Sequence, residues 1–298
     1  MTTTLIRPRR SALYMPGSST RALEKARGLA ADVIIMDLED AVAPSAKEAA
    51  RAAACAALAA GGYGRRETVL RVNGLDTAWG AADIAAAATS GADAVLFPKV
   101  GSAGQLAAAV ARLDAAGGAN LPVWAMIETP AGVLAVDAIA SLAPRLEVLV
   151  MGTADLARAL RLPPDPARLG LLPALGRCLL AARARGLDIL DGIFTDLGDE
   201  PGFRAACRQG KALGLEGKTL IHPAQLAIAN ETFGVSAAEA AAARKTMAAW
   251  QAADAASRGI AVLDGRMIER LHAGEASRLL ALHEACAGPA PDIDENKA

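Results

Sequence analysis

Two acidic residues, Glu128 and Asp155, each follow a short apolar segment, in the contexts MIETP and MGTADLA. Neighbouring strands of a sheet lie about 5 Å apart, so carboxylates at the ends of two such strands reach the same hard cation. Two carboxylates, completed by water and substrate oxygens, are the usual protein ligands of Mg²⁺. Taken singly, each residue is better explained as a helix cap or an arginine partner. Taken together, the pair favours a metal site.

Basic residues follow two other apolar segments. Arg71, in VLRVNG, can bind a carboxylate or stabilise an enolate oxygen without losing its proton. A buried ion pair with Asp37 or Glu39 is an alternative of almost equal weight. Lys99 is a candidate Schiff-base lysine, but that chemistry needs a lowered pKa. Because Asp37, Glu39 and Asp40 supply so much negative charge, an ion pair is expected for Lys99 instead.

The histidines and cysteines do not form the patterns of a zinc or disulfide site. Of the three histidines, His272 and His283 lie close to the C-terminus, so a histidine-based zinc site is not expected. His222 precedes a proline and is expected to be a hydrogen-bonded structural residue. The four cysteines are far apart in sequence and include no CxxC, which favours reduced, metal-free thiols.

The candidate residues stand at the ends of short apolar segments that alternate with alanine-rich helical segments. The apolar segments are mostly continuous, as parallel strands buried on both faces are. Eight repeats of strand and helix predict an α/β fold, a (β/α)8 TIM barrel, whose catalytic groups lie at the carboxyl ends of the strands. A doubly wound open sheet is the weaker alternative, since no GxGxxG follows the first strand. The expected strands are Ala12–Met15, Val33–Asp37, Thr68–Val72, Ala94–Pro98, Val123–Glu128, Glu147–Gly152, Asp188–Ile193 and Thr219–His222, and the expected helices include Thr20–Ala30, Ala46–Ala60, Trp79–Ser90, Ala103–Ala115 and Gly202–Leu213.

The chain is expected to divide into a barrel domain, residues 1–235, and a C-terminal helical extension, residues 236–298. Ser236 and Glu239 have the spacing of a capping box, which starts a helix that runs to about Arg258. A loop or strand-like segment follows, and a second helix is expected over Arg266–Ala287. Residues 288–298 are expected to form a frayed tail. The amphipathic second helix needs a partner surface, on its own barrel or on a neighbour's.

Composition argues against several classes of protein. The 298 residues carry a formal net charge of −1, whereas nucleic-acid binding needs a clustered excess of lysine and arginine. Hydrophobic residues make up 53% and charged residues 21%, which is not a disordered composition. No strongly apolar run is long enough for a transmembrane helix, and no signal-peptide stretch follows MTTTLIRPRRS. We therefore expect a cytoplasmic protein without nucleic-acid or membrane partners.

Together the motifs resemble those of a known family. The segments RSALYMPGSSTRALEKA, DVIIMDLEDAVAP, VLRVNG, LFPKV, AMIETPAG, GTADLA and KTLIHPAQ look like the citrate lyase β-subunit-like branch of the HpcH/HpaI aldolase superfamily, from Arg10 to Phe233. The resemblance implies a TIM barrel with a C-terminal helical extension, assembled as a homotrimer or hexamer. It also implies Mg²⁺, with Mn²⁺ as a substitute, and an acyl-CoA thioester substrate.

The resemblance also implies roles for particular residues. It places the metal ligands at Glu128 and Asp155 and the substrate arginine at Arg71. The acid of the family's GxMID segment, which reaches a neighbouring subunit's site, falls on Glu269 of DGRMIERLH, a glutamate in place of the usual aspartate. The resemblance further implies contacts with CoA at Ser18, Arg21 and Lys25. It implies a substrate carboxylate site at the turn that opens a helix, where the backbone N–H groups can bind an anion: Gly152, Thr153 and Ala154.

The implied reaction is a reversible carbon–carbon bond cleavage of a 3-hydroxyacyl-CoA thioester, such as malyl-CoA or citramalyl-CoA, to acetyl-CoA plus glyoxylate or pyruvate. Arg71 then stabilises the enolate oxygen, a role worth about 3–4 kcal/mol in other enzymes, and Glu269 protonates the enolate carbon. Two alternatives are a 2-oxo-acid aldolase that does not use CoA and the citryl subunit of a citrate lyase complex. The sequence does not identify the acyl-CoA, and it does not exclude hydrolysis of the thioester as the physiological reaction.

Overall fold

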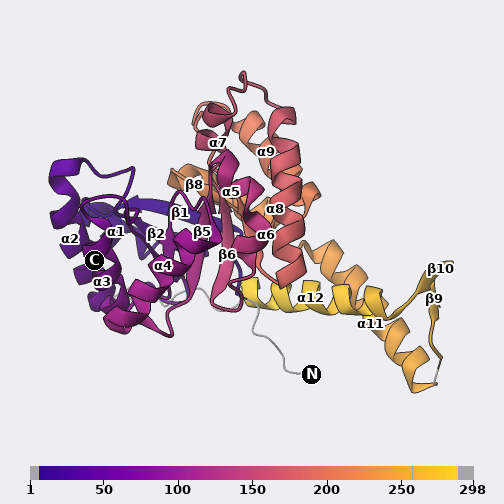
Figure 1. Ribbon diagram of the computed structural model, residues 1–298. Helices are drawn as coiled ribbons and strands as arrows, with labels where there is room; N and C mark the ends of the chain where they lie inside the picture. The colour runs from indigo at the N-terminus through magenta and orange to yellow at the C-terminus, as the bar shows by residue number, and fades with distance from the viewer. Residues whose placement is uncertain (1–6, 257, 288–298) are drawn as a thin grey trace. The chain divides into compact units, whose positions relative to one another are not determined.

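The computed structural model describes residues 7–256 and 258–287. Strands β1 to β8 pair in sequence order as parallel neighbours, and β8 pairs with β1, so the sheet closes into a barrel. Figure 1 shows these strands with α2 and α3 on one side and α8 and α9 on the other. The predicted (β/α)8 barrel is therefore confirmed. Its strands are β1 (Ser11–Pro16), β2 (Val33–Asp37), β3 (Glu67–Arg71), β4 (Ala94–Phe97), β5 (Val123–Ile127), β6 (Leu146–Met151), β7 (Asp188–Asp191) and β8 (Gly217–Leu220).

Alternate strand positions fill the inside of the barrel, because successive side chains of a strand point to opposite faces. The buried interior cluster consists of Ala12, Val33, Ile35, Val69, Ala94, Leu96, Trp124, Met126, Val148, Val150 and Leu190. Asp37, Arg71 and Glu128 each stand two residues beyond a member of this cluster, at the carboxyl ends of β2, β3 and β5. The strand period therefore directs all three side chains inward at the end of the barrel where catalytic groups lie in this fold.

The opposite end of the barrel is closed by an ion-pair network around Arg9. Its guanidinium donates to Glu67 at 2.7 and 2.8 Å, to Asp188 at 2.7 Å and to Glu147 at 3.1 Å. Its Cζ also lies 5.2 Å from the ring centroid of Trp124. Glu67 and Asp188 are the first residues of β3 and β7, so the network ties the amino ends of the strands together.

The helices of the barrel lie close to their expected positions, with one clear difference. The first helix ends at Ala26 instead of Ala30, where the N–H groups of Arg27 and Gly28 bond three residues back and close the helix. The helices are α1 (Thr20–Ala26), α2 (Lys47–Ala60), α3 (Gly80–Thr89), α4 (Ala103–Leu113), α5 (Pro130–Leu134), α6 (Val136–Ala140), α7 (Thr153–Ala159), α8 (Leu172–Arg185), α9 (Glu200–Leu213) and α10 (Leu226–Phe233), with single helical turns η1 (Pro44–Ala46), η2 (Asp114–Gly118), η3 (Leu169–Leu171) and η4 (Pro223–Gln225).

Contacts divide the chain into two compact units, Arg9–Thr232 and a second unit that contains the residues from Phe233 onward. In the second unit, α11 (Ala237–Ala255) begins at the expected capping box. The Ser236 hydroxyl accepts the Glu239 N–H at 3.2 Å, and the Ser236 N–H donates to the Glu239 carboxylate at 2.7 Å. Figure 1 shows α12 (Arg270–Ala287) beside α11, and the two helices are in extensive contact.

A β-hairpin lies between these two helices, so the expectation of a helix from Arg266 onward is wrong. β9 (Ala261–Leu263) pairs antiparallel with β10 (Arg266–Ile268). Asp264 and Gly265 form the turn, with φ values of 51° and 75°. Two consecutive left-handed residues of this kind match the right-handed twist of the flanking strands. α12 therefore begins only at Arg270.

Two further sequence expectations concern the chain ends and membranes. The expected tail, residues 288–298, lies outside the described residues. Among the helices of residues 7–256 and 258–287, none combines the length and the apolar character that crossing a bilayer requires.

Candidate active site

Arg71 lies at the centre of the polar cluster above the barrel interior. Its guanidinium donates two hydrogen bonds to Asp37, from Nε to Oδ1 at 2.7 Å and from Nη2 to Oδ2 at 2.6 Å. Nη1 lies 2.9 Å from a carboxylate oxygen of Glu39. The three side chains are at most 8% exposed, so the ion pair with Asp37 or Glu39 that the sequence left as an alternative is present. Planar, two-pronged geometry of this kind requires arginine rather than lysine.

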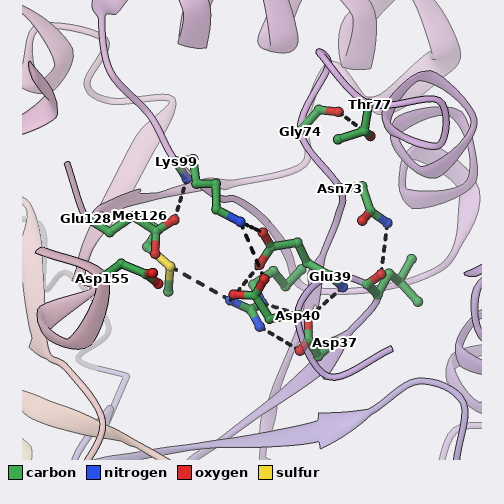
Figure 2. Close-up of polar contacts among 12 residues, drawn as sticks. Asp37, Glu39, Asp40, Asn73, Gly74, Thr77, Lys99, Met126, Glu128 and Asp155 are labelled. Carbon is green, nitrogen blue, oxygen red and sulfur yellow. Dashed lines mark hydrogen bonds and ion pairs between the residues drawn. The ribbon is translucent and has the colours of Figure 1, made fainter. Parts of the chain in front are cut away.

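Lys99 contacts both the Glu39–Asp40 acids and Glu128. Its ammonium pairs with Glu39 and lies 3.4 Å from Asp40, so the expected ion pair is confirmed. Burial by itself lowers the pKa of Lys99, but these carboxylates outweigh it and raise the pKa above its ordinary value. The backbone of Lys99 is left-handed, with φ of 52°, and its N–H donates to Glu128 Oε1 at 2.7 Å. Figure 2 shows the backbone directed to Glu128 and the side chain directed to the acids.

Glu128 follows β5 and is only 2% exposed. Burial raises the pKa of its carboxyl to about 7, and the negative charges of Glu39 and Asp155 add to the rise. Its side chain lies against Gly152, where an added Cβ would come within 2.7 Å of Oε2 and 2.3 Å of the Glu128 Cβ. A glycine is therefore needed at position 152 for Glu128 to keep this place.

Asp155 lies in the first turn of α7, which follows β6, the strand paired with β5. Figure 2 shows its side chain beside that of Glu128, so the structure brings together the two carboxylates that the sequence singled out. Asp155 also pairs with the exposed Arg158, which is the other explanation that the sequence offered for it. In the part of the chain that the structure describes, no third His, Cys, Asp or Glu side chain joins them as a metal-ligand group.

Six further residues are those that the sequence assigned to substrate binding. Ser18, Arg21 and Lys25 are exposed, on the turn after β1 and on α1. Gly152 precedes α7, and Thr153 and Ala154 are its first two residues, the former buried and the latter exposed. All six residues come after the carboxyl end of a strand, β1 or β6, and Ser19 caps α1 by accepting the Ala22 N–H.

Glu269 belongs to the second unit and lies between β10 and α12, where it is half-buried. Its N–H donates to His272 Nδ1 at 3.0 Å, which fixes the backbone at the start of α12. Among the ion pairs of the described residues, none joins Glu269 to Arg266 or Arg270, the partners considered from the sequence. His222 has the expected structural role, since its Nδ1 accepts the Ala224 N–H at 3.2 Å.

A buried lysine behind the acidic loop is a residue that sequence reasoning missed. Lys47 Nζ donates to the carbonyls of Leu38 and Glu39 at 2.9 and 2.7 Å, and to Asn73 Oδ1 at 2.8 Å. Asn73 in turn donates to Asp83 at 2.6 Å. The ammonium thus holds the loop that presents Glu39 to Arg71. The signal that could have found it is a lysine on the face of α2 that otherwise carries only alanines and Leu58.

A second missed cluster lies between the ends of β7 and β8. Asp191 is fully buried and accepts two hydrogen bonds from Arg168, at 2.8 and 2.9 Å, and one from Lys218 at 2.8 Å. Burial by itself raises the pKa of Asp191, but the two cations outweigh it and hold the pKa below its ordinary value. Arg168 comes from the segment between α7 and α8, so the cluster ties that segment to the barrel.

Comparison with known proteins agrees with this arrangement. A family model described as HpcH/HpaI aldolase/citrate lyase matches residues 10–223. The chain is 51% identical over 280 residues to a (3S)-malyl-CoA thioesterase of Cereibacter sphaeroides, covering 94% of this chain and 96% of that one. It is 35% identical to an L-malyl-CoA/β-methylmalyl-CoA lyase of the same organism, covering 88% and 91%.

A solved structure extends the comparison to three dimensions. Protein CitE from Mycobacterium tuberculosis, crystallised with magnesium, acetoacetate and coenzyme A, superposes with a TM-score of 0.72 at 29% identity. The match covers 92% of this chain and 97% of that one. The barrel, the order of the motifs and the matched span agree, and the chain belongs to the HpcH/HpaI aldolase/citrate lyase family.

Proposed function

We propose that this chain is a magnesium-dependent carbon–carbon lyase that cleaves or forms a malyl-CoA-type 3-hydroxyacyl-CoA thioester. One observation carries the proposal. The side chains of Glu128 and Asp155, which follow the neighbouring strands β5 and β6, lie side by side in one cluster with the buried guanidinium of Arg71. The relatives named for malyl-CoA chemistry support the substrate class.

The two carboxylates suit a hard cation. Burial, with nearby negative charge, raises the pKa of Glu128 to about 7, and a bound divalent cation would favour its charged form. The Lys99 N–H holds Oε1 at 2.7 Å, which leaves Oε2 available as a ligand. A magnesium ion bound there supplies Lewis-acid polarisation of the substrate oxygens. The magnesium of the CitE crystal supports the same choice of metal.

Arg71 supplies a fixed positive charge for the oxygen that becomes negative during cleavage. Asp37 holds the guanidinium plane, so little reorganisation is needed when charge develops.

Thr153 and Ala154, the first two residues of α7, offer backbone N–H groups to the small-acid end of the substrate. The Gly152 N–H does not, because it donates to the Ile127 carbonyl at 3.0 Å. We propose that Arg21 and Lys25 contact the CoA phosphates, a role supported by their charge and exposure.

The second unit completes the proposed site from outside the barrel. We propose that residues 236–298 pack on a neighbouring subunit of a trimer or hexamer and bring Glu269 to that subunit's barrel. There the carboxyl group protonates the enolate carbon. The hydrogen bond from the Glu269 N–H to His272 supports this role, because it fixes the backbone that carries the acid.

Thioester hydrolysis is a second candidate function. It is favoured by the 51% identity to a (3S)-malyl-CoA thioesterase over nearly the whole of both chains. In that reaction the same residues bind the substrate, but water attacks the thioester carbonyl and the products are malate and CoA.

Product identification separates the candidates. The purified protein is incubated with Mg²⁺ and malyl-CoA, citramalyl-CoA or citryl-CoA, and the products are resolved by liquid chromatography and mass spectrometry. Cleavage gives acetyl-CoA with glyoxylate, pyruvate or oxaloacetate, whereas hydrolysis gives free CoA and the intact hydroxy acid. Turnover of none of the three thioesters, or turnover that EDTA leaves unchanged, contradicts the proposal.

A further inference from the structure

Tyr14 lies inside the barrel beneath Arg71. It is two residues beyond Ala12 on β1 and packs against the interior cluster. The Arg71 Cζ lies 4.7 Å from the centroid of its ring, within the range of a cation–π contact. The charges of Asp37 and Glu128 are close enough to act on its phenol. Tyr14 therefore forms part of the inner wall of the candidate active site. It lies in the RSALYMPGSSTRALEKA segment, but the sequence predicted no role for it.

The hydroxyl of Tyr14 is the unusual feature. The oxygen is buried and has no hydrogen-bond partner among the described residues. The other tyrosine of the chain, Tyr63, is satisfied, since its hydroxyl donates to the Leu23 carbonyl at 3.1 Å. Proteins seldom leave a buried donor without an acceptor, because the lost hydrogen bond is destabilising. Burial also raises the pKa of Tyr14, so the phenol remains a proton donor at neutral pH.

We propose that the Tyr14 hydroxyl donates a hydrogen bond to a carboxylate oxygen of the small-acid part of the substrate. This inference rests on the proposed function. In the proposed function the small-acid end of the thioester meets Glu128, Asp155 and Arg71, and its carboxylate is an acceptor that suits a buried hydroxyl donor beside Arg71. Met126 also lies against Arg71, with its sulfur 3.9 Å from Nη1, and an unbranched methionine side chain adapts its shape more readily than other core residues.

The variant Tyr14→Phe tests this directly, because it keeps the ring under Arg71 and removes only the oxygen. We expect Mg²⁺-dependent binding of glyoxylate or pyruvate, measured by calorimetry, to weaken about ten- to hundredfold, as for a hydrogen bond to a charged acceptor. Binding of CoA is expected to stay unchanged. Without ligand, the thermal midpoint of Tyr14→Phe is expected to equal or exceed that of the wild type, because a buried donor without a partner has been removed.

Tyr63→Phe is the matched control and should behave in the opposite way. It loses a satisfied hydrogen bond, so its thermal midpoint falls while its affinity for the oxo acid stays unchanged. The inference is overturned if Tyr14→Phe binds glyoxylate and pyruvate as tightly as the wild type, or if it is destabilised as Tyr63→Phe is. A wild-type protein that binds neither oxo acid with Mg²⁺ contradicts the proposed function and this role of Tyr14 together, whereas a defect confined to Tyr14→Phe supports both.

Discussion

At the scale of the residue, the chemical role proposed for Arg71 falls on a side chain that also has a structural role. Asp37 occupies Nε and Nη2, and Glu39 lies against Nη1, so the cation is held before any substrate arrives. Such preorganisation is what makes a fixed charge effective in a buried site. The same contacts make Arg71 part of the folded core, and its replacement is expected to affect both activity and stability.

The variant Arg71→Lys separates the planar guanidinium from its charge. A lysine keeps the charge but cannot grip Asp37 with two parallel hydrogen bonds. We expect kcat/KM for the thioester substrate to fall about a hundredfold or more, together with a lower thermal midpoint. Arg177→Lys, at a partly exposed pair with Asp137, is the control and should change neither quantity. Near wild-type kcat/KM in Arg71→Lys would show that the reaction does not need the two parallel hydrogen bonds of the guanidinium.

At the scale of the element, strand ends could be predicted from the sequence and long-range partners could not. Continuous apolar runs located all eight strands, and the strand period then placed Arg71 and Glu128 at one end of the barrel. Lys47 and Arg168 escaped prediction because their partners come from distant segments and follow no local period. The loop or strand-like segment expected before Arg266 contains β9 and the Asp264–Gly265 turn. Only β10 was missed, because the helix was expected to begin at Arg266 rather than at Arg270.

The buried cluster of Asp191, Lys218 and Arg168 predicts a pH-dependent stability. The pKa of Asp191 is held below its ordinary value near 3.8, so its contribution is fully present above that pH and is lost as the pH falls toward the lower, folded-state pKa. Asp191→Asn leaves two buried cations without their carboxylate, which in other proteins is destabilising by about 3–5 kcal/mol.

Urea denaturation followed by circular dichroism measures this effect. The difference in unfolding midpoint between the wild type and Asp191→Asn should be large and constant from pH 7 to pH 5 and should shrink below about pH 4. A difference that stays the same down to pH 3 would mean that ionisation of Asp191 is not what stabilises this part of the barrel.

At the scale of the whole molecule, the proposal makes each site depend on two subunits. The barrel supplies Arg71 and the carboxylate pair, and the extension of a neighbour supplies Glu269. An Arg71→Ala protein and a Glu269→Gln protein should then each be inactive. Unfolding and refolding them together should restore partial activity, because some sites in mixed oligomers receive both intact residues.

In this mixing test the two variants carry different affinity tags. Oligomers that bind to both affinity resins in turn contain both variants, so mixed assembly is verified before the assay. Refolding each variant alone under the same conditions should give no activity. Mixed oligomers without recovered activity would mean that Glu269 serves its own barrel or has no catalytic role.

The binding of Mg²⁺ tests the central claim, that Glu128 and Asp155 together hold the metal. Calorimetric titration should show one Mg²⁺ site in the wild type and in Asp137→Asn, a control carboxylate on α6. Glu128→Gln and Asp155→Asn keep the shape of the side chain but lose the charge that a hard cation requires. Both should bind Mg²⁺ at least about tenfold more weakly while keeping the wild-type circular dichroism spectrum. Wild-type affinity for Mg²⁺ in either variant would contradict the claim.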